Sequence, residues 1–398
     1  MQNPNTDNSV TEAMFAILKT SLWGEERFPL PSLPDTDWQA VYTELKYHAI
    51  QNLPTDQLVR LDPTRKQLYL GYAYRGLSRW YQIMGEQQTA CDLLKEAGIP
   101  CAILKGAAAG YAYPKNAHRS MGDIDLIVRP QDFDRAYDLL IQDGEYIGET
   151  FRNTVIRKND IIFELHRAFS TANNPEQRAL LDEWILDALD QAESVTTEGF
   201  SFPMLPSQVH GLVLLEHINH HMESGLGLRQ IIDWMMFVDQ EISDAVWNNK
   251  FAPQVRQLGM ETLAVAVTRM CQLYLGLRTD LHWCQCAEDS LCHDLMAHIL
   301  KQGNFGRKLP QKHNKAVSIL STAKNIPALF RILQNYGLHN WTASKKYPFL
   351  RPFAWLYQIF RYLRLGLRQK HPVRYFLYAL KNEHSQDILL DRLEVTRT

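Results

Sequence analysis

The chain has 398 residues, of which 45% are hydrophobic and 22% are charged, and its formal net charge is −2. No uncharged apolar run is long enough to span a bilayer, and the first residues lack the basic-then-apolar pattern of a secretory signal. Six scattered cysteines do not form a disulfide framework in that setting. These features exclude a membrane-spanning or disulfide-stapled secreted protein, and they predict a soluble cytoplasmic enzyme of two or three folded units.

The first region, residues 1–84, is predicted to be helical. Apolar residues recur at helical spacing over 10–23, 37–48 and 64–97, and proline-containing segments separate these stretches. We therefore expect a helical region before the part of the chain that carries the chemistry.

A small mixed α/β unit is predicted over 85–170. Its expected elements, in chain order, are a strand near 100–104, a helix from Gly106, a strand from Asp123, a helix over 131–143 and two strands that end near Glu164.

Beyond this unit the apolar pattern is mostly helical. We expect a helical companion domain over 171–294, with a hairpin-like interruption at 195–204, and a basic helical module over 295–398. The predicted fold class is therefore α+β: a small mixed-sheet core between a helical N-terminal part and a larger, mostly helical C-terminal part.

Two aspartates open the apolar stretch DIDLIV at 123–128. Because side chains alternate faces along a strand, Asp123 and Asp125 point the same way and stand about 6 to 7 Å apart. Ile124, Leu126 and Val128 point into the opposite layer. Two carboxylates at that separation are suited to sharing divalent metal ions, although an isolated D-x-D pattern is also common in solvated loops.

A third carboxylate is expected from IIFELH at 161–166, which is typical of another buried strand. If this strand lies beside the Asp123 strand, Glu164 joins Asp123 and Asp125 at one sheet edge. Such a group suits magnesium, which prefers oxygen ligands and keeps positions open for substrate phosphates. The chemistry indicated is phosphoryl or nucleotidyl transfer; the structural alternative for Glu164 is a strand-end side chain that faces solvent.

The turn before the Asp123 strand is suited to binding phosphate. Gly106 begins a predicted helix, and helix N-termini present free N–H groups to anions. Lys105 and Arg119 would neutralise the charge of a triphosphate. Ordinary surface salt bridges are the alternative role for both cations.

These residues together resemble the nucleotidyltransferase superfamily typified by polymerase beta, and most closely its bacterial branch of uncharacterised nucleotidyltransferase family proteins. The match rests on Leu104-Lys105-Gly106, on Arg119 and on the three carboxylates, and it is strong over about residues 85–170. The superfamily turn usually reads Gly-Gly or Gly-Ser, whereas this chain has Lys105-Gly106-Ala107. The resemblance implies that Lys105, Gly106, Ala107 and Arg119 bind the nucleotide.

The resemblance also implies an activity. A nucleoside monophosphate would pass from a nucleoside triphosphate, such as ATP, to an acceptor hydroxyl with release of pyrophosphate, and Asp123, Asp125 and Glu164 would be the catalytic metal ligands. Magnesium is the expected ion, and manganese would satisfy the same carboxylates. The acceptor stays open among RNA, a protein hydroxyl and a small sugar or antibiotic.

The predicted companion domain contains a histidine-rich helix. His217 and His221 lie four residues apart on one face, beside His220, and apolar neighbours favour half-buried packing over a role at the cleft. Arg229 and Asp233, also four apart, are predicted to form an ion pair within one helix. The cysteines at 284, 286 and 292 match no common zinc spacing.

Charge is strongly segregated along the chain. Residues 295–382 contain 16 Lys and Arg and no Asp or Glu, so the rest of the chain carries about −18. The tail interleaves aromatic residues with Arg361, Arg364 and Arg368, a pattern that suits RNA or another polyanion. Association with an anionic membrane surface and docking on the acidic remainder of the chain are the alternatives.

Two other functions compete with catalysis. One is a nucleotide-binding module without transfer activity, which the intact D-x-D pattern and Glu164 argue against. The other is an RNA-binding or scaffold protein that depends on the basic C-terminal module and not on the acidic triad.

Overall fold

The structure of the chain is a computed structural model. It describes residues 4–33, 35–172, 174–308, 347–367 and 388–394, with several single positions and pairs between 330 and 344. The chain divides into two compact units, Met1–Lys308 with Arg392–Thr398, and Leu309–Asp391. Much of the predicted basic module, including Arg368, lies outside the described residues.

The predicted N-terminal helices are confirmed. They are α1 (Pro4–Trp23), α2 (Trp38–Tyr47), α3 (Thr55–Leu61), the short 3-10 turn η1 (Pro63–Arg65) and α4 (Lys66–Glu96). The side chain of Asp37 accepts the backbone N–H of Ala40 at 3.1 Å and so caps the start of α2. Trp38, Val41 and Leu45 are buried at helical spacing, which explains why this segment folds as a helix against its neighbours.

A seven-stranded sheet forms the centre of the first unit, in the order β3-β4-β5-β2-β1-β7-β6. The strands are β1 (Cys101–Ile103), β2 (Asp123–Val128), β3 (Glu145–Glu149), β4 (Asn153–Lys158), β5 (Ile161–His166), β6 (Glu193–Thr197) and β7 (Phe200–Met204). The β2–β5 and β1–β7 pairs are parallel, and the other neighbouring pairs are antiparallel. The sheet is therefore mixed, as the α+β prediction requires.

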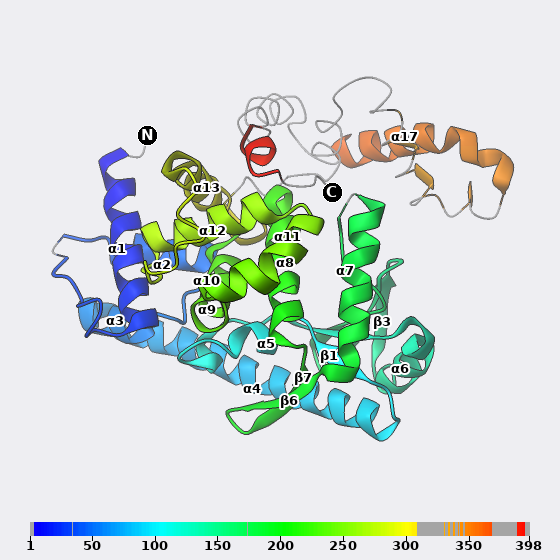
Figure 1. Cartoon of the computed structure of the whole chain (residues 1–398), viewed down its shortest axis with the longest axis horizontal. Helices are drawn as coiled ribbons and strands as arrows, with labels where there is room; N and C mark the ends of the chain where they lie inside the picture. Colours follow the sequence, from blue (N-terminus) through cyan, green and yellow to red (C-terminus); the bar gives the residue numbers. More distant parts are fainter. Residues whose placement is uncertain are drawn as a thin grey trace. The chain divides into compact units, whose positions relative to one another are not determined.

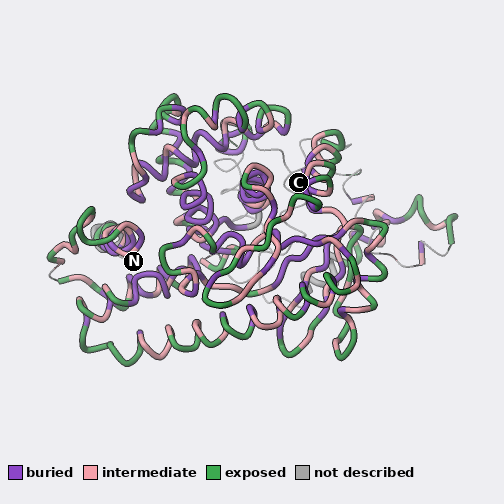
Figure 2. The backbone as a smooth tube through the Cα atoms, turned by 60° about the horizontal axis from the view of Figure 1, so that its bottom comes forward, coloured by how far each residue is buried: buried purple, intermediate pink, exposed green. Residues whose placement is uncertain are grey.

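Helices α4 and α6 (Phe133–Leu140) cover one face of this sheet (Figure 1). Their apolar side chains share one core with the strands, including Trp80, Ile83 and Phe133 against Leu126 and Phe163. Buried positions run along the central strands in Figure 2, whereas α4 is buried only along one side, at residues such as Trp80, Ile83 and Leu94. Full burial of a large apolar side chain stabilises the fold by about 1.5–3 kcal/mol. The shared core on this face of the sheet therefore holds the strands in register.

The sheet differs from the sequence prediction in three places. The helix after Gly106 is only α5 (Ala107–Gly110), followed by the 3-10 turn η2 (Asn116–His118). The helix predicted over 131–143 is shorter, because the 3-10 turn η3 (Pro130–Asp132) precedes α6. The hairpin predicted within the helical part instead joins the central sheet, because Met204 of β7 pairs with Ile103 of β1. This pairing covers the backbone edge that the short strand β1 would otherwise expose.

Helices dominate the rest of the first unit, as predicted. They are α7 (Pro175–Asp187), η4 (Ala188–Gln191), α8 (Ser207–Ser224), α9 (Leu228–Glu241), α10 (Asp244–Val246), the π-helical turn η5 (Trp247–Phe251), α11 (Ala252–Gln257), α12 (Glu261–Tyr274), α13 (Asp289–Gln302) and the 3-10 turn η6 (Asn304–Gly306). Helix α9 packs against α8, α12 and α5. Through α5 it reaches the segment that connects β1 with β2.

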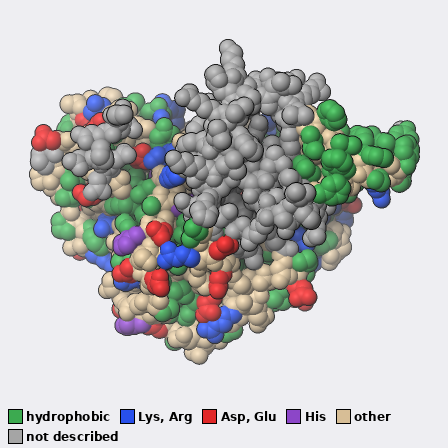
Figure 3. All heavy atoms as spheres, turned by 90° about the horizontal axis from the view of Figure 1, so that it is seen from above, with side chains coloured by type: hydrophobic (Ala, Val, Ile, Leu, Met, Phe, Trp, Pro, Cys, Tyr) green, Lys and Arg blue, Asp and Glu red, His purple; other side chains and the backbone are tan. Residues whose placement is uncertain are grey.

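The second unit contains the 3-10 turn η7 (Pro348–Phe353) and helix α17 (Ala354–Leu367). Trp341 stacks on Tyr357 with ring centroids 5.1 Å apart. Other aromatic side chains, among them Phe349 and Phe360, are exposed, and hydrophobic side chains gather over α17 (Figure 3). None of the helices described here has the length and apolar character that crossing a membrane requires.

Candidate functional site

The predicted carboxylates meet on two neighbouring strands. Strands β2 and β5 run parallel, with Asp125 directly opposite Glu164 and Asp123 two residues before Asp125 on the same face. All three carboxylates line a cavity of about 230 Å³, together with Lys105 and Gly106 from the turn after β1. The register of one parallel strand pair therefore brings together residues that lie about 40 positions apart in the sequence.

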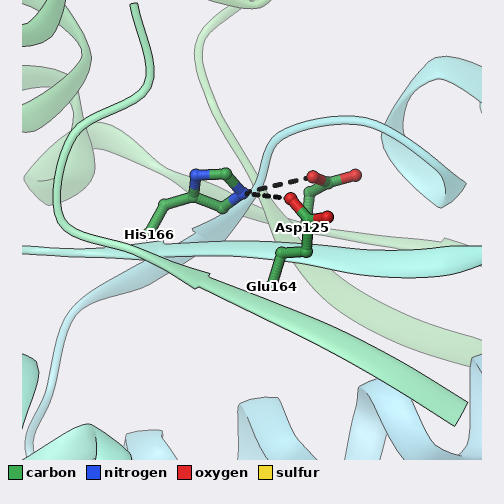
Figure 4. Close-up of side chains that lie close together, drawn as sticks. All are labelled: Asp125, Glu164 and His166. Atoms are coloured by element: carbon green, nitrogen blue, oxygen red, sulfur yellow. Dashed lines mark hydrogen bonds and ion pairs between the residues drawn. The ribbon is translucent and has the colours of Figure 1, made fainter. Parts of the chain in front are cut away.

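Asp125 is the centre of a buried polar network. Its Oδ1 atom lies 2.7 Å from Lys105 Nζ and 3.2 Å from His166 Nε2, and the residue is only 2% exposed. His166 Nε2 also lies 3.4 Å from Glu164 Oε2, which accepts a hydrogen bond from Asn153 Nδ2 at 3.0 Å. Figure 4 shows the His166 ring turned toward both carboxylates.

Local electrostatics separate the two aspartates. Burial disfavours the charged form of Asp125, but Lys105 and His166 outweigh burial and hold the pKa of Asp125 well below its ordinary value. For Asp123, burial and then the Asp125 charge outweigh the opposing charges of Lys105 and Arg229 and raise its pKa. Burial also opposes the charge on Lys105, yet Asp125, Asp123 and Glu164 together raise its pKa. Asp125 therefore stays ionised, and Asp123 holds a proton more readily.

The site has donors that fit a divalent ion. Asp125, Glu164 and His166 each offer a ligand atom, and these atoms all lie within 4.8 Å of one another. Carboxylate oxygens suit magnesium, and an added imidazole nitrogen is also acceptable to manganese. His166 was missed in the sequence, although its signal was present: it lies two residues after Glu164 and so shares its face of β5.

The predicted nucleotide-binding turn is only partly exposed to the cavity. Gly106 lines it and has a positive φ of 57°, a conformation that glycine adopts without steric cost. The side chain of Ala107 instead packs in the hydrophobic core under the sheet. Lys105 reaches the cavity, with its ammonium on Asp125.

Arg119 lines the cavity but is engaged by the companion helices. Its Nε and NH2 atoms lie 2.8 and 2.6 Å from the two oxygens of Asp233 on α9, and both residues are buried. Tyr113 donates its hydroxyl to the same carboxylate at 2.7 Å. The ion pair predicted between Arg229 and Asp233 is thus replaced, and Arg229 donates to the carbonyl of Ser120 at 3.2 Å. Because Arg119 and Asp233 lie on separate elements, the planar guanidinium can meet both carboxylate oxygens at once. This two-bond geometry is the strong form of an Arg–carboxylate pair.

Helix α8 supplies another wall. His217, His220 and His221 line the cavity, with the rings of His217 and His221 4.7 Å apart. Burial and nearby His220 lower the pKa of His221 to about 3, and burial with Lys105 lowers that of His217. The imidazoles of His217 and His221 are therefore neutral at pH 7. The histidine-rich helix combines the two roles weighed from its sequence, because its rings are packed and also face the cavity.

Several cavity residues were not predicted for the site from the sequence, among them Arg152 and Phe305, and Arg229 was predicted only as an ion-pair partner within its helix. Each of these three comes from an irregular segment or from a helix end: the turn before β4, the start of α9 and η6. The spacing of apolar residues in the sequence does not identify such positions. Only the folded structure shows that they lie near the carboxylates.

A mixed sheet that carries carboxylates on adjacent strands beside a glycine turn, with helices around it, is the arrangement that the sequence predicted for a nucleotidyltransferase. Residues 34–276 match the model of a family described as uncharacterised nucleotidyltransferase, and the chain belongs to this family. A structure of an antigenic nucleotidyltransferase-like protein from Paracoccidioides brasiliensis matches 49% of this chain and 93% of its own, at 14% identity and a TM-score of 0.31. None of the curated proteins matches.

Proposed function

We propose that the protein is a divalent-metal-dependent nucleotidyltransferase that transfers a nucleoside monophosphate from a nucleoside triphosphate to an acceptor hydroxyl. The observation that carries this proposal is the convergence of Asp123, Asp125 and Glu164 on one cavity, together with the buried cation Lys105. Membership of the family supplies the reaction class.

In the proposed reaction, the acceptor oxygen attacks the α-phosphorus in line. A bond forms between that oxygen and phosphorus, the bond to the bridging oxygen breaks, and pyrophosphate leaves with the bonding electrons. A magnesium or manganese ion held by the carboxylates, with His166 as a further donor, would supply charge neutralisation and acidify the acceptor hydroxyl.

The side chains of this chain have distinct tasks in the scheme. Asp125 stays ionised beside Lys105 and orients the reacting groups. Glu164 or a neighbouring carboxylate accepts the proton of the acceptor hydroxyl. Gly106 allows close approach of a phosphate to the backbone, and Lys105 adds positive charge.

The acceptor is proposed to be RNA, a protein or a small molecule with a free hydroxyl. The basic C-terminal segment is the feature that favours a polyanion, since residues 295–382 hold 16 Lys and Arg and no acidic residue. Arg361 on α17 is exposed, as contact with a polyanion requires.

The test is incubation with each α-labelled nucleoside triphosphate, Mg²⁺ and a cell extract, with label followed into RNA, protein and small-molecule fractions. Wild type is compared with Asp123→Asn, with Asp125→Asn and with the control Asp190→Asn. The side chain of Asp190 is 69% exposed and forms an ion pair with Arg129. Loss of one metal ligand should reduce transfer by about 1,000-fold, which corresponds to about 4 kcal/mol.

The control should transfer label at the wild-type rate. Label that enters one fraction and depends on both aspartates establishes transfer and identifies the acceptor class. If wild type binds a nucleotide but labels no fraction, the transfer proposal is wrong, and a binding role becomes the better explanation.

A further inference from the structure

Four cationic side chains line the cavity: Lys105, Arg119, Arg152 and Arg229. Two are neutralised by the protein itself, since Lys105 pairs with Asp125 and Arg119 with Asp233. Among the residues whose side chains are described, Arg152 and Arg229 form no ion pair with a carboxylate. The cavity therefore contains two guanidinium groups whose charge the described part of the protein does not pair.

Arg229 is the more enclosed of the two. Its NH1 atom donates to the carbonyl oxygen of Ser120 at 3.2 Å, while its Nε atom is buried without a hydrogen-bond partner. Its guanidinium lies 5.8 Å from the centre of the Phe305 ring at the same cavity. Burial, and then the charge of Arg119, lower its pKa. A buried cation with an unused donor is unfavourable unless an anion binds there.

Arg152 approaches the cavity from the turn before β4. Its NH1 atom donates to the carbonyl oxygens of Ser170 at 3.2 Å and Phe169 at 3.5 Å, which fixes the side chain and leaves other N–H groups for a ligand. A guanidinium has five N–H donors in a rigid fork that matches phosphate oxygens. Arg152 and Arg229 thus satisfy the chemistry of a phosphate site better than the two cations already held by carboxylates.

The adjacent wall on α8 contributes the imidazole of His217 and the buried carboxylate of Glu216, which already accepts the backbone N–H and the hydroxyl of Thr171. The imidazole of His217 is neutral, and the charges that act on it besides burial come from Lys105, Arg229 and Arg119. Four carboxylates, Asp123, Asp125, Glu164 and Glu216, line the same cavity, so an anion is favoured where Arg152 and Arg229 can donate to it directly.

We propose that Arg229 and Arg152 bind the polyphosphate of the substrate, while Lys105 and Arg119 hold the protein's own carboxylates in place. The proposal rests on the proposed function and specifies its substrate-binding residues. The ligand class is a tri- or pyrophosphate group, which offers several oxygens to two guanidinium forks at once.

The test is isothermal titration of the full-length protein with tripolyphosphate in the presence of Mg²⁺. Arg229→Gln and Arg152→Gln should each weaken binding about 10- to 100-fold, because each removes charge-assisted hydrogen bonds. The control is Arg157→Gln on β4. The Arg157 side chain is 45% exposed and forms a surface ion pair with Glu145, so the affinity of this variant for tripolyphosphate should stay within about twofold of wild type.

Arg229→Lys keeps the charge but loses the fork, so it should bind with intermediate affinity. It also serves if Arg229→Gln does not fold, and Arg152→Gln gives an independent answer. Wild-type affinity in the Gln variants, or no binding of tripolyphosphate by wild type, overturns the assignment.

Nucleotidyl transfer is measured separately on the same proteins. Failure of the transfer proposal alone would appear as tripolyphosphate binding that depends on both arginines while wild type transfers no label. Failure of this inference alone would appear as wild-type transfer with an unchanged KM for the triphosphate in Arg229→Gln and Arg152→Gln.

Discussion

The two walls of the cavity are built in different ways. The sheet wall carries Asp123, Asp125 and Glu164, whose positions follow from the register of two adjacent strands. The helix wall carries neutral histidines and Arg229, and its position depends on contacts between residues far apart in the chain. Alternation along the strands and one strand pairing thus set the acidic wall, whereas packing between helices and turns sets the wall that faces it.

This difference predicts unequal sensitivity to mutation. The sheet wall is supported by a shared hydrophobic core on α4 and α6. The helix wall is attached by a few specific contacts: the Arg119–Asp233 ion pair, the close packing of Gly225, and the hydrogen bond from Leu228 to His48. Each of these contacts can be broken separately.

The largest effect is expected from Arg119→Leu. It leaves the buried carboxylate of Asp233 without its cation, which should lower the free energy of unfolding by about 3–5 kcal/mol in urea titrations. The double variant Arg119→Leu/Asp233→Leu should recover much of the loss, because no charge is left unpaired.

The control for the ion pair is Arg256→Leu, which breaks an exposed pair with Glu261 and should cost no more than about 1 kcal/mol. Equal losses for Arg119→Leu and Arg256→Leu would contradict a structural role for the buried pair.

A smaller loss is expected from Gly225→Ala, at the turn between α8 and α9. Gly225 has a φ of +112°, and a Cβ there would lie 2.0 Å from the backbone nitrogen of Gly306. Strain and overpacking together should cost about 2–4 kcal/mol, measured by urea unfolding.

Gly24→Ala is the matched control for that packing. Gly24 also has a positive φ, +85°, but a Cβ added there would meet no atom within 4 Å, so only the backbone strain of about 1 kcal/mol should appear. The difference between the two variants measures how tightly the α8–α9 turn packs on η6.

The smallest effect concerns pH. Burial lowers the pKa of His48 to about 3 from its ordinary 6.5, and its Nδ1 accepts the N–H of Leu228 at 3.3 Å. The unfolded chain therefore binds a proton at higher pH than the folded chain does, and stability falls as the pH drops below about 6.5.

Between pH 7 and pH 5 this one histidine should remove about 2 kcal/mol of stability. His48→Asn keeps an acceptor near Nδ1 but does not titrate, so its unfolding free energy should vary less over this pH range. The same pH slope in both proteins would show that His48 does not contribute.

Much of the fold could be predicted from the sequence because its signals are local. The helices at 10–23, 37–48 and 64–97 have apolar residues at helical spacing, and each is present close to its predicted bounds. The strand that begins at Asp123 and the strand that ends at His166 are both short apolar runs between turn residues. Their shared face also explains why Asp123, Asp125 and Glu164 could be named together.

Other features could not be predicted because they depend on partners distant in the sequence. The hairpin β6–β7 has the local pattern of two strands, but nothing in it says that β7 will pair with β1. Arg229 and Asp233 have the spacing of a helical ion pair, yet Arg119 competes for the same carboxylate from 114 residues away and has better geometry.

By itself the sequence determined that Asp123 and Asp125 share one face of their strand, because side chains alternate along a strand. The pairing of β2 with β5, which places Glu164 opposite Asp125, belongs to the tertiary structure. Only the tertiary structure decided which cations those carboxylates and Asp233 neutralise, and which ones remain for a substrate. The physical reason is that charge pairing depends on distance in space, and burial makes each unpaired charge costly. That pairing leaves Arg152 and Arg229 as the guanidinium groups that face the cavity without a described ion-pair partner, although the local spacing had assigned Arg229 to Asp233.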